Sequence, residues 1–124
     1  MNIVISNTSN LPIYEQIVRA IKNEIIEGNL KENDALPSIR GLAKDLQISI
    51  ITTNRAYEEL EKEGLVYSKA GKGFFIKAKN ASMLMEKKIQ GIEDDMQELV
   101  MECKKSGISK DEMIGMLEVI WDEL

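Results

Sequence analysis

Few side chains in this sequence are suited to covalent or metal chemistry. The chain has no histidine and a single cysteine, Cys103. An intrachain disulfide is therefore excluded, and a His/Cys zinc site is not expected. No serine or cysteine has a histidine base to activate it, and no glycine-rich loop matches the phosphate-binding loops of nucleotide enzymes. We therefore expect no enzyme, no bound metal and no cofactor.

The residues with binding chemistry gather in three short stretches: Ser38 to Arg40, residues 49–55, and residues 69–72. A guanidinium can hold a phosphate through two parallel hydrogen bonds, and hydroxyl groups can donate to phosphate oxygens. An asparagine amide can read an adenine edge, and an exposed isoleucine can touch a thymine methyl group. These groups suit recognition of a charged, hydrogen-bonding ligand.

Three helices are expected to position the first two stretches, over about 12–27, 38–46 and 49–63. Apolar residues recur in each at helical spacing, and Ser38 and Ser49 are suitable N-caps. The second and third helices, joined by a tight turn, predict a helix-turn-helix. The N-terminal turns of helix 49–63 would then enter a major groove.

The outward face of helix 49–63 is not fully determined by the pattern. The expected buried face consists of Ile48, Thr53, Ala56, Tyr57 and Leu60. At least one of Ile50 and Ile51 is then exposed, and Ile50 is favoured over Ile51 as the residue that faces the groove. Packing of both isoleucines in the core is the alternative.

A β-hairpin is expected next, with strands at 65–68 and 74–77. Its loop, 69–73, contains Lys69, Gly71 and Lys72. A glycine allows close approach to a phosphate or a minor groove, and lysines add attraction. An ordinary solvated turn is the alternative. Three helices followed by a hairpin predict a mainly α winged helix-turn-helix fold of the α+β class.

A different pattern begins after residue 79. Apolar residues at heptad spacing predict one helix over 81–105, and Ser109 with Glu112 predicts a capping box that opens a second helix. This two-helix tail is expected to form an αα-hairpin with more apolar surface than it can bury alone, so a homodimer is favoured over a cofactor site. The expected interface consists of Met85, Ile89, Ile92, Met96, Leu99, Met113, Leu117, Ile120 and Trp121. Cys103 lies on the same seam as a small core residue, with a redox role as the weaker alternative.

The charge distribution supports a division into a DNA-binding domain at 1–78 and a dimerisation tail at 79–124. Residues 1–78 carry ten Lys and Arg and ten Asp and Glu. Residues 79–124 carry six against eleven, so the net charge of −5 lies entirely there. A neutral first part can still present a basic face. We see no secretory signal or membrane span, and the cytoplasm is the expected compartment.

Residues 12–76 resemble the GntR family of transcription regulators. Residues 36–43 read LPSIRGLA, 48–57 read ISIITTNRAY, 60–66 read LEKEGLV, and 71–76 read GKGFFI. The upstream PIYEQI at 12–17 also matches. The short helical tail resembles the YtrA branch. Departures from the family pattern stand at Gly41, Ile50 and Asn54, and the last two leave the operator sequence open.

The resemblance implies a dimeric repressor that binds a double-stranded DNA operator, with a transporter-type operon as its target. It makes Arg40 a DNA contact, whereas a surface pair with Asp45 is the alternative. The expected DNA-binding residues are Ser38, Arg40, Ser49, Ile50, Thr52, Asn54, Arg55, Lys69, Gly71 and Lys72. A small-molecule effector is left open by the sequence, and the rival function is a helical protein-interaction adaptor.

Overall fold

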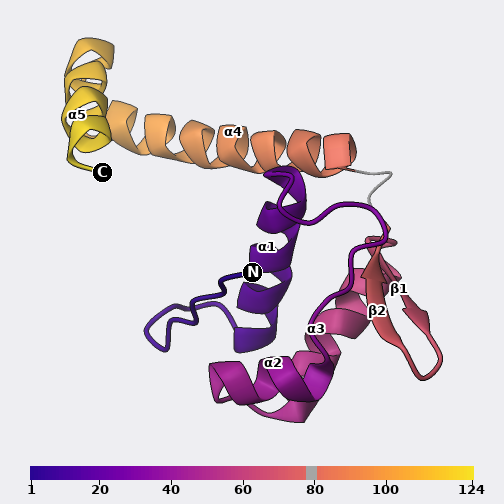
Figure 1. The fold of residues 1–124 in the computed structure, drawn as a ribbon. Helices are drawn as coiled ribbons and strands as arrows, with labels where there is room; N and C mark the ends of the chain where they lie inside the picture. The colour runs from indigo at the N-terminus through magenta and orange to yellow at the C-terminus, as the bar shows by residue number, and fades with distance from the viewer. Residues whose placement is uncertain (78–80) are drawn as a thin grey trace. The chain divides into compact units, whose positions relative to one another are not determined.

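The computed structural model describes residues 1–77 and 81–124, which form two compact units, Met1–Met85 and Glu86–Leu124. The first unit contains helices α1 (Ile13–Ile26), α2 (Ile39–Leu46) and α3 (Ile50–Lys62). Strands β1 (Val66–Lys69) and β2 (Gly73–Ile76) follow, then helices α4 (Ala81–Lys105) and α5 (Lys110–Glu123), as Figure 1 shows. The domain boundary expected at 78–79 lies outside the described residues.

Helix α3 is central to the first unit, because it packs against both α1 and α2 and leads into β1. Its buried side chains meet those of α1 and of the hairpin in one core. The most deeply buried residues, each at 2% exposure or less, are Ile17, Ile21, Thr53, Ala56, Tyr57, Leu60, Val66 and Ile76. Each large apolar side chain buried in this way stabilises the fold by roughly 1.5–3 kcal/mol. The outward face of α3 is therefore fixed by a well-packed inner face.

Two features set the path of the chain around α2 and α3. Gln47 adopts the left-handed conformation that ends α2, with φ of 55°. The hydroxyl of buried Tyr57 donates to the Pro37 carbonyl at 2.7 Å and so ties α3 to the segment before α2. Burial raises the pKa of Tyr57, so the phenol remains a donor at ordinary pH. The angle between the two helices thus has a specific anchor.

The β-hairpin, here called the wing, pairs antiparallel with Val66 opposite Ile76 and Lys69 opposite Gly73. The segment before α2 joins its edge: Leu36 N–H donates to the Phe74 carbonyl, and Ile76 N–H donates to the Asp34 carbonyl, both at 2.9 Å. This extra pairing attaches the wing to the start of the helix-turn-helix, a connection that the sequence pattern did not reveal.

In the second unit, the predicted capping box at Ser109 and Glu112 is confirmed. The predicted αα-hairpin is not: α5 has no buried residue, and in Figure 1 it runs crosswise to α4 and does not fold back along it. Heptad spacing predicts that a helix has an apolar face but not which surface covers that face. The apolar pattern of the tail was therefore wrongly taken to predict that α4 and α5 pack on each other. Cys103 is buried at 6% exposure. None of the described helices is both long and apolar enough to cross a membrane.

Candidate nucleic-acid interface

The N-terminus of α3 is closed by a pair of hydroxyl groups. Ser49 Oγ accepts the Thr52 N–H at 3.0 Å, as expected of an N-cap, and donates to Thr52 Oγ1 at 2.8 Å. The Ser49 proton is therefore used within the helix. Within the described residues, nothing accepts the Thr52 hydroxyl proton. Thr52 is thus the better placed of the two to donate to an external oxygen.

The outward face of α3 is centred on Ile51. Successive residues turn by about 100° around a helix, which places Ile51 opposite the buried Thr53, Ala56, Tyr57 and Leu60. Ile51 is accordingly 82% exposed, whereas Ile50 is 48% exposed. Counting the angle from the four buried residues would have ranked Ile51 above Ile50, and the sequence prediction did not do so.

Two polar residues flank Ile51 on this face. The Asn54 amide donates to Glu58 Oε1 at 2.8 Å, which holds the amide while its oxygen and second N–H remain available. Arg55 lies with its guanidinium carbon 3.8 Å from the centre of the Tyr14 ring on α1. We call Ile51 and Asn54 the reading face, and Arg55 lies at its flank. Tyr14 was absent from the predicted site, because no local pattern links two residues this far apart in the chain.

The second stretch of binding residues opens α2. Ser38 Oγ accepts the Gly41 N–H at 3.0 Å, which confirms the predicted cap. A Cβ atom at Gly41 would lie 2.8 Å from that oxygen, so a larger residue there would displace the Ser38 hydroxyl. Arg40 is exposed and, among the described residues, makes no ion pair with Asp45 or another acid. Its charge is therefore available to a phosphate.

The wing supplies the third stretch at its tip. Gly71 has φ of 73° and Gly73 has φ of 102°, conformations that disfavour other residues. The Lys69 ammonium lies 5.1 Å from the centre of the Phe75 ring, and that ring stacks on Tyr67 at 5.6 Å. Lys72 is exposed at the turn. The wing therefore presents two cations on a tightly turned backbone.

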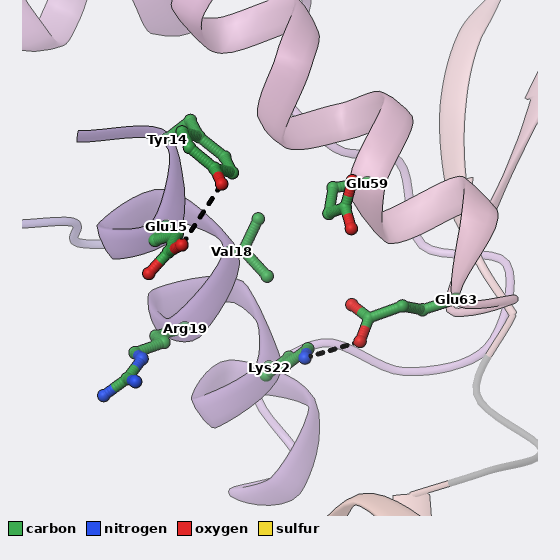
Figure 2. Close-up of a pocket in the computed structure, with 7 residues that line it drawn as sticks. All are labelled: Tyr14, Glu15, Val18, Arg19, Lys22, Glu59 and Glu63. Atoms are coloured by element: carbon green, nitrogen blue, oxygen red, sulfur yellow. Dashed lines mark hydrogen bonds and ion pairs between the residues drawn. The ribbon is translucent and has the colours of Figure 1, made fainter. Parts of the chain in front are cut away.

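Acidic side chains lie mainly toward the other end of α3. Glu59 and Glu63, with Arg19 and Lys22 of α1, line a cavity of about 220 Å³ between the two helices. Lys22 pairs with Glu63 at 3.0 Å, and Arg19 points away from both glutamates (Figure 2). This mixture of charges is largely self-compensating, so we assign the cavity no ligand. Glu58 lies beside Asn54, so the acids are not fully separated from the reading face.

Comparison with known proteins identifies the family of this chain. The model for bacterial regulatory proteins of the gntR family matches residues 13–76, just over half the chain. The chain belongs to the GntR family. It is 32% identical over 111 residues to the HTH-type transcriptional repressor YtrA of Bacillus subtilis, covering 90% of this chain and 85% of that protein.

Two solved structures have a similar fold. A transcriptional regulator from Oenococcus oeni is 31% identical with a TM-score of 0.73, over 94% of this chain and 97% of that one. AraR(DBD) in complex with operator ORX1 is 25% identical with a TM-score of 0.55, over 61% of this chain and 95% of that one. The winged helix fold is confirmed, and this GntR protein is a DNA-binding transcription regulator and not an enzyme.

Proposed function

We propose that the chain binds a two-fold symmetric operator as a homodimer and represses transcription by blocking the promoter. The observation that carries the proposal is the reading face: a capped α3 presents Ile51 and Asn54 outward, with Arg55 at their flank. Arg40, exposed at the start of α2, makes no ion pair among the described residues. A helix in this position enters the major groove through its N-terminal turns. The operator complex solved for AraR, a protein of similar fold, supports the same use of this domain.

Each stretch then has a role. Arg40, Ser38 and Thr52 contact phosphates and set the position of the helix, while Asn54 and the isoleucines contact base edges. Lys69, Gly71 and Lys72 bring the wing against the adjacent backbone or minor groove. Ser49 acts through its cap and through Thr52. Ser49 is given no direct DNA contact because its hydroxyl proton is already donated to Thr52, whereas the polar groups of the other residues still have hydrogen-bonding capacity for DNA.

The tail supports the homodimer. The apolar stripe of α4 consists of Met85, Ile89, Ile92, Met96 and Leu99, which are 44–57% exposed. On α5, Leu117, Ile120 and Trp121 are 51–76% exposed, and Met113 is half-buried. Apolar surface this continuous favours a partner, and a second copy would set two reading faces on half-sites about 34 Å apart.

Ile92→Glu against Met101→Glu tests the dimer. The two side chains are 50% and 51% exposed, but Met101 lies off the stripe, on the other side of α4. Ile92 occurs twice in a symmetric interface, so losing its burial costs about 3 kcal/mol, or more than about 100-fold in dimer dissociation. Sedimentation analysis should give a monomer for Ile92→Glu and a dimer for Met101→Glu. Equal behaviour of the two variants would refute the stripe as the interface.

Arg40→Ala against Lys62→Ala tests the DNA contact. Both cations lie on helices of the helix-turn-helix, but Lys62 is about 18 Å along α3 from its first residue. A mobility-shift assay on the promoter upstream of the chain's own gene should show weaker binding and a smaller salt slope for Arg40→Ala only. Unchanged binding in Arg40→Ala would remove that residue from the interface.

The target belongs to the same proposal. We extend the proposal to a transporter-type operon, which the resemblance to the YtrA branch implies, and to the cytoplasm, where a chromosomal target would place the protein. Selection of bound fragments from the source genome is the test. Recovery of fragments without a transporter operon downstream would contradict this part of the proposal while leaving DNA binding intact.

A further inference from the structure

Arg55 has acidic neighbours but contacts an aromatic ring instead. Glu59 lies one helical turn further along α3, at the spacing that favours ion pairs. Among the described residues, however, Arg55 makes no ion pair, and its guanidinium carbon lies 3.8 Å from the centre of the Tyr14 ring. Its positive charge is therefore held in place without being neutralised by a carboxylate.

The ring is itself held by α1. The Tyr14 hydroxyl donates to Glu15 Oε1 at 3.1 Å, and this hydrogen bond raises the pKa of the phenol, so the ring stays neutral. Tyr14 is half-buried against the core of the first unit, and Figure 2 shows it on the first turns of α1, facing Glu15. Packing against the core does not depend on the hydroxyl, and it keeps the neutral ring in place as a platform for a guanidinium.

Contact with a ring leaves the binding edge of the guanidinium open. The five N–H donors of arginine lie in one plane, and contact across the face does not consume them. The contact also draws Arg55 toward α1, to the flank of α3, and away from Ile51 at the centre of the reading face. A guanidinium on that flank meets the wall of a groove, where phosphates lie, and not its floor.

We infer that Arg55, held against the Tyr14 ring, binds a backbone phosphate at the edge of the groove and does not read a base, and that Tyr14 is the residue that positions it. This inference rests on the proposed DNA-binding function. It assigns a role to Tyr14, and it separates Arg55 from Asn54 and Ile51, which face the bases.

The test measures binding of full-length variants to two duplexes by fluorescence anisotropy over a range of salt. One duplex is recovered by selection from genomic fragments, and the other is a scrambled duplex of the same length. Arg55→Gln should weaken both by the same factor, about 10-fold or more, and lower the salt slope by about one. Ile51→Ala, in contrast, should weaken only the selected duplex.

Tyr14 is tested by rescue and by a double-mutant cycle. Tyr14→Leu should weaken both duplexes about 3–5-fold, whereas Tyr14→Phe, which keeps the ring face, should bind like the unmodified protein. Adding Tyr14→Leu to Arg55→Gln should produce no further loss. Lys22→Gln, at the other end of the α1–α3 contact, is the matched control and should change neither affinity nor slope.

Several outcomes would overturn the inference. Loss confined to the selected duplex in Arg55→Gln, with an unchanged salt slope, would make Arg55 a base reader. A full additional loss from Tyr14→Leu in the Arg55→Gln background, or failure of Tyr14→Phe to bind, would show that Tyr14 does not act through Arg55. Failure of the selection to recover any fragment that the unmodified protein binds would instead refute the proposed function.

Discussion

Replacing Tyr57 by phenylalanine tests whether one hydroxyl fixes the helix-turn-helix. The substitution keeps the buried ring and its edge-to-face contact with Phe74 at 5.2 Å, and it removes only the bond to the Pro37 carbonyl. The Pro37 carbonyl then lacks that partner in a part-buried position. We expect α3 to lose its direct tie to the segment before α2.

The size of the effect follows from the burial of the bond. Leaving a buried acceptor without its partner costs about 1–3 kcal/mol, and we take about 1.5 kcal/mol because the site is part-buried. For a domain of this size, that loss lowers Tm by roughly 6–12 °C. The ring itself adds nothing to the loss, since phenylalanine fills the same volume.

Thermal unfolding followed by circular dichroism is the assay, with Tyr67→Phe as the matched control. Tyr67 also donates a 2.7 Å hydrogen bond, to Asn33 Oδ1, but at an exposed position where water can replace it. Its loss should cost less than about 0.5 kcal/mol. Equal Tm values for Tyr57→Phe and the unmodified protein, or equal losses in the two variants, would refute the argument that burial makes the Pro37 bond matter.

Three further predictions concern the caps, the glycines and the reading face. Ser109→Ala removes the capping box of α5 and should cost about 1 kcal/mol, seen as lower helicity and weaker self-association; an unchanged spectrum would contradict it. Gly71→Ala forces a side chain into φ of 73° and should destabilise by about 1 kcal/mol in chemical denaturation, whereas Gly91→Ala, in open space on α4, should stabilise by a similar amount. Ile51→Ala should reduce discrimination between operator variants in binding competition more than Ile50→Ala does, because Ile51 is the more exposed; the reverse order would move the centre of the reading face.

Much of the local structure could be predicted from residue types and spacing. Ser38, Ser49 and Ser109 each cap the helix that follows them, because a short hydroxyl side chain can reach an unpaired N–H there. Helical spacing identified the buried face of α3, and glycines marked the turn of the wing. These features depend on neighbours within a few residues, so one sequence is enough to reveal them.

The arrangement of distant groups was decided by the tertiary structure alone. Tyr14 meets Arg55, Tyr57 meets Pro37, and Leu36 pairs with the wing only because the core brings α1, α3 and the hairpin together. The same limit explains the misread tail: an apolar stripe states that a surface is to be covered, but not by what. The amino-acid sequence determines which face of a helix or strand is apolar, because that depends on the helical or strand period. Which two faces meet depends on the packing of the whole chain.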